Sequence, residues 1–358
     1  MMIGVILLNL GGPDSLQAVK PFLYNLFSDR QIIRLGPPFM QKPLAWLIST
    51  IRSKKTEKMY SKIGGKSPIS DITKAQAKAL EEALNKGSNP PFTKGGQGRI
   101  TNTSDSFKVY IGMRYWRPFA EDVVEEIFSY GIRKLVGLSL YPQYSVTTSG
   151  SSLSQFREVS SRYDMEIFTV DSWHNHPLYI EALVDVIKKG LESFDRESNP
   201  PFTKGGRGGI TQSSPDIHIL FSAHSLPQKI IDQGDPYVDQ TLETIREIER
   251  QLPVRWHLSY QSKSGPVKWL EPSTDDKLEE LARDGIKNVL VVPISFVSDH
   301  IETLYEIDIL YKNLAGKLNI NLKRTEALNT HPKFIGALQD IVQKCLKDSE
   351  KNKSAGLP

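Results

Sequence analysis

The stretch Ile217-His-Ile-Leu-Phe-Ser-Ala-His-Ser-Leu-Pro227 carries the most information about the fold of this chain. Residues 217–221 are apolar and β-prone, and a turn of small residues that ends in proline follows them. The pattern predicts a buried strand with His224 at its carboxyl end. Ligands of open α/β sheets bind at this end of the strands, and an imidazole there can bind a metal or move a proton near neutral pH. We therefore expect His224 to lie in a functional site.

Seven similar short runs along the chain predict further strands, and segments of helical period separate most of them. Strands that alternate with helices imply parallel sheets with right-handed crossovers. Because four runs fall in each half, we expect an α/β protein made of two similar doubly wound, Rossmann-like domains whose four-stranded parallel sheets face a central cleft. The eight predicted strands are residues 5–10, 108–113, 134–140, 166–170, 217–221, 254–260, 288–294 and 321–328.

The expected N-terminal domain covers residues 1–172 and the expected C-terminal domain covers residues 173–330. We expect a helix at 331–347 to pack back on the N-terminal domain, and a frayed polar tail at 348–358.

Residues 88–101 and 198–211 are near-identical repeats rich in proline and glycine. They lack the Gly-Lys-Ser/Thr ending of a phosphate-binding loop. Each copy also lies between a predicted helix and the following strand, at the end of the sheet away from ligands. We therefore interpret both repeats as inserted surface loops.

The composition excludes several classes of protein. The formal net charge of +4 over 358 residues gives no basic footprint for nucleic acid. The single cysteine, Cys345, excludes an intrachain disulfide and an all-cysteine metal site within one chain. No run approaches the roughly 20 apolar residues of a membrane span, and residues 1–10 are better explained by a buried strand than by a signal peptide. We expect a cytoplasmic protein.

A second informative stretch, residues 293–308, runs from a predicted strand into an acidic helix that we expect to begin near Ser298. Asp299, Glu302 and Glu306 would share one face of that helix. Helix capping explains Asp299, but it does not explain Glu306, which lies two turns in. An acidic face directed into a cleft fits a path for a hydrated cation.

Taken together, residues 221–227 and 293–308 resemble the paired signature of the ferrochelatases, which insert ferrous iron into protoporphyrin in the last step of haem biosynthesis. The resemblance implies that His224 is the principal base or metal ligand and that Glu302 faces it across the porphyrin plane. It leaves open which of the two receives the metal and which takes protons. It also implies an outer metal path through Asp299, His300 and Glu306.

Other segments extend this resemblance. Residues 60–69 are similar to a family segment in which the tyrosine and the serine, here Tyr60 and Ser67, contact porphyrin. Arg52 occupies the place of an arginine that takes part with them, and a guanidinium suits a porphyrin propionate. Residues 110–115, which include Arg114 and Tyr115, resemble a strand end that lines the pocket.

The resemblance also bears on cofactors and partners. Porphyrin and ferrous iron are then small-molecule substrates, and no resident cofactor is implied. Ferrochelatases with an iron–sulfur cluster use several cysteines, so this chain should lack a cluster. Residues 37–48 correspond to a lip of the pocket that can meet the membrane, although an ordinary buried helix explains them almost equally well.

Three other functions compete with this one. A related chelatase would act on coproporphyrin or insert cobalt into a corrin precursor. A non-catalytic porphyrin or haem carrier would need the apolar slot but not the carboxylates of Glu302 and Glu306. A nucleotide-dependent oxidoreductase could share the fold, but no Gly-x-Gly-x-x-Gly follows the first strand.

Overall fold

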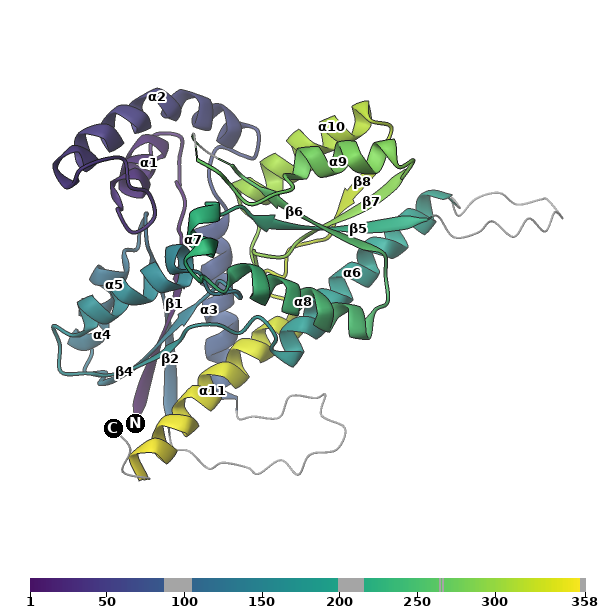
Figure 1. The fold of residues 1–358 in the computed structure, drawn as a ribbon. Coiled ribbons are helices and arrows are strands. Elements are labelled where there is room, and N and C mark those ends of the chain that lie inside the picture. The colour runs from purple at the N-terminus through teal and green to yellow at the C-terminus, as the bar shows by residue number, and fades with distance from the viewer. Residues whose placement is uncertain (87–104, 199–215, 264, 266, 355–358) are drawn as a thin grey trace.

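The computed structural model describes residues 1–86, 105–198, 216–263, 265 and 267–354. In these residues the chain forms two four-stranded parallel sheets (Figure 1). The N-terminal sheet has the order β2-β1-β3-β4 and the C-terminal sheet has the equivalent order β6-β5-β7-β8. The strands are β1 Met2–Asn9, β2 Ser106–Met113, β3 Lys134–Ser139, β4 Glu166–Val170, β5 Ile217–His224, β6 Trp256–Gln261, β7 Asn288–Pro293 and β8 Asn321–Arg324.

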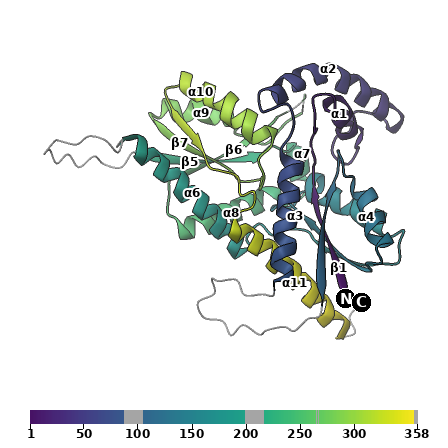
Figure 2. The same cartoon turned by 180° about the vertical axis from the view of Figure 1, so that it is seen from behind.

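Helices connect these strands and cover the sheets (Figures 1 and 2). The two π-helices, η2 Val146–Gly150 and η3 Glu302–Tyr311, follow the third strand of each sheet. A short 3-10 helix, η1, covers Pro38–Met40. The α-helices are α1 Val19–Ser28, α2 Gln41–Ser61, α3 Ile69–Asn85, α4 Ala120–Ser129, α5 Ser151–Ser160, α6 Pro177–Ser198, α7 Gln228–Asp232, α8 Tyr237–Gln251, α9 Thr274–Arg283, α10 Lys312–Lys317 and α11 Pro332–Ser354.

Successive side chains of the central strands point to opposite faces of each sheet, and both faces are buried. In β1, Val5 and Leu7 belong to the largest apolar cluster, whereas Ile6 and Leu8 pack on the opposite face with α4 and α5. This is the burial expected of a parallel sheet covered on both sides. The predicted fold class, α/β with two four-stranded parallel sheets, is confirmed.

The last helix joins the two halves of the molecule. It contacts α3 and β4 of the N-terminal half and also α6, which precedes the C-terminal sheet (Figure 2). Its residues Phe334 and Leu338 lie in the same apolar cluster as Leu80 of α3 and Ile187 of α6. The largest core of the described residues is therefore continuous across both sheets.

The structure corrects two predicted boundaries. The acidic helix begins at Glu302 rather than near Ser298, and it is a π-helix over its first ten residues. The last helix continues to Ser354, so residues 348–354, which we expected in a frayed tail, are helical. The repeat at 88–101 lies outside the described residues, as does the repeat at 198–211 apart from Ser198.

Candidate active site

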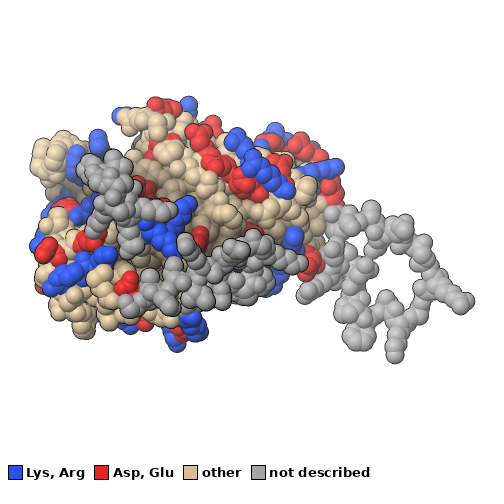
Figure 3. All heavy atoms as spheres, turned by 90° about the horizontal axis from the view of Figure 1, so that it is seen from below, with Lys and Arg blue, Asp and Glu red and all other residues tan. Residues whose placement is uncertain are grey.

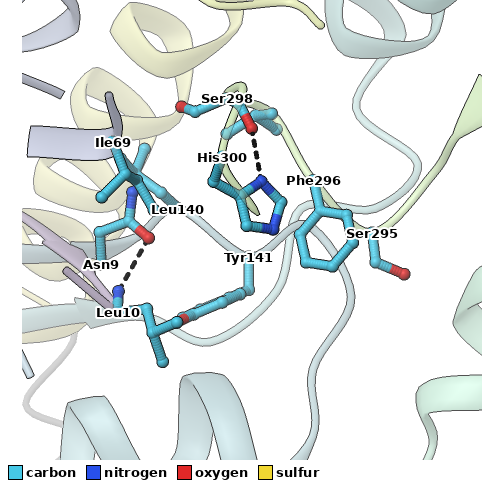
Figure 4. Close-up of a pocket in the computed structure, with 10 residues that line it drawn as sticks. Asn9, Leu10, Ile69, Leu140, Tyr141, Ser295, Phe296, Ser298 and His300 are labelled. Atoms are coloured by element: carbon cyan, nitrogen blue, oxygen red, sulfur yellow. Dashed lines mark hydrogen bonds between the residues drawn. The ribbon is translucent and has the colours of Figure 1, made fainter. Parts of the chain in front are cut away.

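The carboxyl ends of strands from both sheets meet around a small cavity (Figure 4). Its volume of about 30 Å³ is comparable to the space of one water molecule, so a porphyrin does not fit inside it. The residues that line it follow β1, β3 and β7 or begin α3: Asn9, Leu10, Ile69, Leu140, Tyr141, Ser295, Phe296, Val297, Ser298 and His300.

His224 is the last residue of β5, and its backbone is held on both sides. Its amide donates a hydrogen bond to Ser295 Oγ at 3.2 Å, and its carbonyl accepts one from the Tyr237 hydroxyl at 2.9 Å. Ser295 and Tyr237 also bond to each other at 2.6 Å. The imidazole is therefore displayed from a rigid strand end.

The imidazole of His224 makes a direct hydrogen bond to Glu302 at the start of η3. Its Nδ1 lies 2.8 Å from Glu302 Oε2. Burial lowers the pKa of His224, but the charge of Glu302 and this hydrogen bond outweigh burial and raise it. Burial likewise opposes ionisation of Glu302, and the interaction with His224 outweighs it and lowers the pKa of that carboxyl.

This contact changes the expected arrangement of the pair. A separation of 2.8 Å leaves no room for a porphyrin ring between His224 and Glu302. The two side chains thus lie on the same side of any bound ring, and the expectation that Glu302 faces His224 across the porphyrin plane is wrong for this structure. The reason is that the loop after β7 brings Glu302 directly beside the end of β5.

Two residues link Glu306 to the same pair: Gln261, the last residue of β6, and Ser262, which follows it. Ser262 Oγ is 2.8 Å from Glu302 Oε2 and 2.6 Å from Glu306 Oε2. Gln261 Nε2 donates to the Glu302 carbonyl at 3.0 Å and to Glu306 Oε2 at 3.2 Å. The two carboxyl groups therefore meet at one serine hydroxyl.

The shared hydroxyl has a consequence for protonation. A serine has one proton to donate, so only one of the two carboxylates can accept it at a time. Burial, together with the negative charge of Glu302, raises the pKa of Glu306 to about 7. Glu306 is therefore partly protonated near neutral pH, while Glu302 stays ionised.

His300 is buried beside this group. Its Nδ1 lies 3.0 Å from the Ser298 carbonyl, and its ring stands at 61° to that of Phe296, with the centroids 4.3 Å apart (Figure 4). Its Nε2 is 4.0 Å from Glu302 Oε1 and has no hydrogen-bond partner in the described part of the chain. Burial lowers the pKa of His300, so the ring is neutral at neutral pH.

Asp299 does not join the other acidic residues. It lies before η3 instead of on a shared helix face, and its Oδ1 accepts hydrogen bonds from Arg324 Nη1 at 3.0 Å and Thr303 Oγ1 at 3.1 Å. Its Oδ2 accepts one from Asn329 at 3.0 Å. The expected acidic face of three residues is therefore wrong, because the helix begins at Glu302 and leaves Asp299 in the preceding loop.

Tyr60 and Ser67 lie on the N-terminal side of the site, at and after the end of α2. The Tyr60 side chain is buried, and burial together with the charge of Glu302 raises its pKa. The amide of Ser67 donates to the Pro13 carbonyl at 2.7 Å. Arg52, on the same helix, is exposed, with its guanidinium 5.4 Å from the centre of the Phe27 ring.

Arg114 and Tyr115 converge on an aspartate that the sequence did not single out. Arg114 Nη2 and the Tyr115 hydroxyl lie 2.7 Å and 2.8 Å from the same oxygen of Asp29. Arg114 also donates to Gln31 Oε1 at 3.0 Å. The guanidinium is thus already paired within the protein.

The structure adds three residues to the site: Gln261, Ser262 and Asp29. A signal existed for the first two, because they follow a predicted strand that neighbours β5, and Gln261 pairs in register with His224. Asp29 had none, since it meets Arg114 across 85 positions of sequence. Within the described residues, no group of three or more His, Cys, Asp or Glu side chains is arranged to hold a metal ion.

Comparisons with known proteins agree in pointing to one family. The family model described as Ferrochelatase matches residues 2–346. A ferrochelatase of Desulfotalea psychrophila is 47% identical over 341 residues, which cover 95% of this chain and 96% of that protein. A ferrochelatase of Gloeothece citriformis is 46% identical over 356 residues, covering 97% of this chain and 83% of that protein.

Solved structures show the same fold at low sequence identity. SirB from Bacillus subtilis, determined with Fe3+, superposes with a TM-score of 0.51 at 13% identity, and the match covers 98% of each chain. A sirohydrochlorin chelatase SirB from Bacillus subtilis subspecies spizizenii in complex with cobalt matches with the same score at 12% identity. On the evidence of the family model and the relatives of high identity, this chain belongs to the ferrochelatase family.

Proposed function

We propose that this chain inserts ferrous iron into protoporphyrin and releases two protons, with His224 and Glu302 as its central residues. The observation that carries the proposal is the hydrogen bond between His224 Nδ1 and Glu302. It leaves Nε2 as the reactive nitrogen, because Nε2 has no hydrogen-bond partner among the described residues and the side chain is 32% exposed. The pair thus presents one oriented, reachable nitrogen to a substrate.

The chemistry follows from this orientation. The Glu302 carboxylate accepts a hydrogen bond from Nδ1–H of His224, which fixes the tautomer and leaves a lone pair on Nε2. Nε2 accepts a pyrrole proton, and the charge of Glu302 stabilises the imidazolium that forms. His224 passes this proton to solvent and then accepts the second pyrrole proton, and Fe2+ replaces the two protons at the four nitrogens, so charge balances. Glu306, which shares Ser262 with Glu302, and His300, whose Nε2 lies 4.0 Å from Glu302 Oε1, are proposed to form the outer path for the ion.

Arg52, Tyr60 and Ser67 are proposed as porphyrin contacts. Arg52 is exposed on α2, the helix that also carries the buried Tyr60, and we propose that it meets a propionate. Arg114 and Tyr115 are better suited to shaping the pocket than to binding a propionate, because Asp29 already accepts their hydrogen bonds. The protein is proposed to need no iron–sulfur cluster, which its single cysteine supports.

A peripheral membrane contact is proposed for the region around η1 and α2. Phe39, Trp46 and Ile51 are 76%, 57% and 69% exposed, a large apolar area for a protein surface. Lys20 lies 5.3 Å from the centre of the Trp46 ring and would suit an anionic headgroup. No helix in the described ranges has the length and hydropathy to cross a bilayer. We accordingly propose a cytoplasmic protein that touches the inner membrane face.

Nucleic acid is not proposed as a partner. On the face of the molecule shown in Figure 3, basic and acidic side chains are interspersed. The small net charge of +4 agrees with that distribution.

An anaerobic assay tests the proposed reaction. Purified protein is mixed with Fe2+ and, in separate reactions, protoporphyrin, coproporphyrin and a corrin precursor, and the product is followed by its absorption spectrum. We expect insertion into protoporphyrin at the highest kcat/KM. Faster insertion into coproporphyrin, or cobalt insertion into the corrin precursor, would assign the chain to a related chelatase. Binding of porphyrin without insertion of any metal would indicate a carrier.

A vesicle assay tests the membrane contact. Flotation with vesicles that contain anionic lipid is compared for the unaltered protein and a Trp46→Ser/Ile51→Ser variant. We expect the unaltered protein to float with the vesicles and the variant to remain in the dense fraction. Equal recovery of both would contradict the proposed contact.

A further inference from the structure

Arg324, the last residue of β8, is joined to two aspartates on either side of Glu302. Its Nε and Nη2 donate to the two carboxylate oxygens of Asp308, each at 2.8 Å. Its Nη1 donates to Asp299 Oδ1 at 3.0 Å and to the Thr325 carbonyl at 3.1 Å. The Arg324 side chain is 11% exposed and that of Asp299 is 20% exposed, so this ion pair is largely shielded from water, whereas Asp308 is 37% exposed.

The two aspartates enclose the part of the chain that carries the site. Asp299 lies in the loop before η3, and Asp308 lies within η3. Glu302, which contacts His224, and Glu306 fall between them. One guanidinium therefore bridges the loop and the interior of the helix, and the segment between is held at both ends.

The acidic residues of this segment separate into two groups with different directions. Glu302 and Glu306 point to Ser262, on the side of β6. Asp299 and Asp308 point to Arg324, on the side of β8. The π-helical winding of η3 determines the side on which each of these carboxylates lies. An ordinary α-helical winding would rotate Glu302 and Glu306 away from Ser262 and His224.

A π-helix needs support from its surroundings. Its i→i+5 bonding is rare, and it occurs mostly as single turns inside α-helices, frequently at functional sites. Arg324 provides such support through a planar fork that matches both oxygens of Asp308, a geometry that lysine cannot reproduce. Asn329, in the loop after β8, holds Asp299 by two more hydrogen bonds, at 3.0 Å and 3.1 Å.

We propose that Arg324 is a positioning residue for metal insertion, which fixes the winding of residues 299–308 and thereby keeps Glu302 in contact with His224. The proposal rests on the proposed function of that pair. It gives Asp299 and Asp308 the role of anchors for Arg324. Asp299 is then no part of a metal path, since its two oxygens already accept bonds from Arg324, Thr303 and Asn329.

The test compares Arg324→Lys with Arg255→Lys. Arg255 is a matched control because it pairs with Asp216 at 3.1 Å but is 70% exposed, at the start of β6 and away from the site. We expect Arg324→Lys to lower kcat by about ten- to a hundredfold, the range found when a residue that orients a metal-site ligand is changed. The KM for porphyrin should stay within about twofold, since the Arg324 guanidinium is paired with Asp308, Asp299 and the Thr325 carbonyl and is not proposed to touch the ring. Arg255→Lys should match the unaltered protein.

Hydrogen–deuterium exchange supplies a readout that does not depend on activity. The amides of 302–308 should exchange faster in Arg324→Lys, while those of α4 and α5 in the other half stay unchanged. Asp308→Asn, at a side chain that is 37% exposed, removes one charge while keeping Arg324, and we expect the same changes at smaller size. If Arg324→Lys folds poorly, Asp308→Asn still tests the proposal.

The results distinguish the positioning role of Arg324 from the proposed function of the chain in metal insertion. A lower melting temperature with unchanged kcat and unchanged exchange in η3 would overturn the positioning role. Unaltered protein that inserts no metal would contradict the proposed function, and faster exchange of 302–308 in Arg324→Lys would then still support the role of Arg324 in holding the segment.

Discussion

At the scale of single residues, the contact between His224 and Glu302 determines which atoms are available to a substrate. Nδ1 of the imidazole is occupied, so Nε2 is the nitrogen that can accept a proton. Ser262 then connects Glu302 to Glu306, whose raised pKa leaves it partly protonated. The two glutamates therefore differ in charge near neutral pH although they lie on the same helix.

Replacement of His224 by alanine should abolish insertion while porphyrin binding largely survives. The imidazole is proposed as the base, and general-base groups contribute about a hundred- to ten-thousandfold to rate. Binding of the ring depends mainly on apolar contact, which the substitution hardly changes. Turnover is measured anaerobically and binding by fluorescence quenching, with His257→Gln, on β6 away from the site, as the control. Near-normal turnover of folded His224→Ala would refute the assignment.

Glu302→Gln should cost far more activity than Glu306→Gln. Glu302 is ionised and pairs with His224, whereas Glu306 is partly protonated near pH 7, so its amide changes the charge of the site less. We expect a loss of about ten- to a hundredfold for the first variant and a several-fold smaller loss for the second. Equal, small losses would mean that the acidic helix acts only as a solvated surface.

The pH profile of Glu302→Gln tests the same pair. In the unaltered protein Glu302 raises the pKa of His224 against the opposing effect of burial, and the base must be neutral to accept a proton. Removing the negative charge lowers the pKa of His224, so the residual activity should persist to lower pH than in the unaltered protein. The acidic limb of kcat/KM against pH measures this shift, and an unmoved limb would contradict the coupling.

At the scale of secondary-structure elements, the local sequence pattern predicted the strands, but it did not predict where η3, the helix that carries Glu302 and Glu306, begins. All eight predicted strands exist, and β4 has the predicted bounds, because runs of β-branched residues between helices are a local signal. The start of η3 was predicted too early because Ser298 and Asp299 look like helix caps. Their polar groups instead bond to Gln76 and Asn329, which are distant in sequence. The π winding depends on such contacts and has no local signature.

The turn after β1 offers a test at this scale. A Cβ on Gly12 would lie 2.5 Å from Ser67 Oγ and 2.6 Å from Ser67 Cβ, so Gly12→Ala must displace the chain that follows α2. We expect a loss of about 1–3 kcal/mol in the free energy of unfolding, as for other overpacked sites. Gly316→Ala is the control, because nothing lies within 4 Å of its Cβ position and it sits in α10. There we expect a gain of up to about 1 kcal/mol, measured by denaturant unfolding.

At the scale of the molecule, the two repeats are predicted to be dispensable. Replacement of residues 90–100 and 200–210 by short Gly/Ser linkers should leave turnover intact. The first joins the end of α3 to the start of β2 and the second joins the end of α6 to the start of β5, so both connect to the amino ends of strands, opposite His224. Shortening a loop changes its closure entropy by only about 0.6 kcal/mol per halving of length. A shortened protein that folds, by circular dichroism and a cooperative melt, yet inserts no iron would make the repeats functional.

The arrangement of the two halves was predictable from the even distribution of strands, but the residues that join them were not. Gln76 of α3 donates to Ser298 Oγ and to the Asn329 carbonyl, and Gln143 donates to Thr244 across the same boundary. Polar residues of this kind carry no periodic signal, since a single glutamine looks the same on a surface as between domains. We expected the helix at 331–347 to pack on the N-terminal half, but no local pattern indicated that it would share one core with α6 as well.

The path of α11 has a consequence for how the protein is made. A ribosome releases the N-terminal half first, yet the apolar side of α3, including Leu80, is covered by a helix that begins at Pro332. The first half therefore emerges with an incompletely covered core, which stays exposed until α11 has been translated. Nascent chains in that state expose apolar surface and attract chaperones or aggregate. Although α11 is distant from the active site, the yield of folded protein in the cell should therefore depend strongly on it.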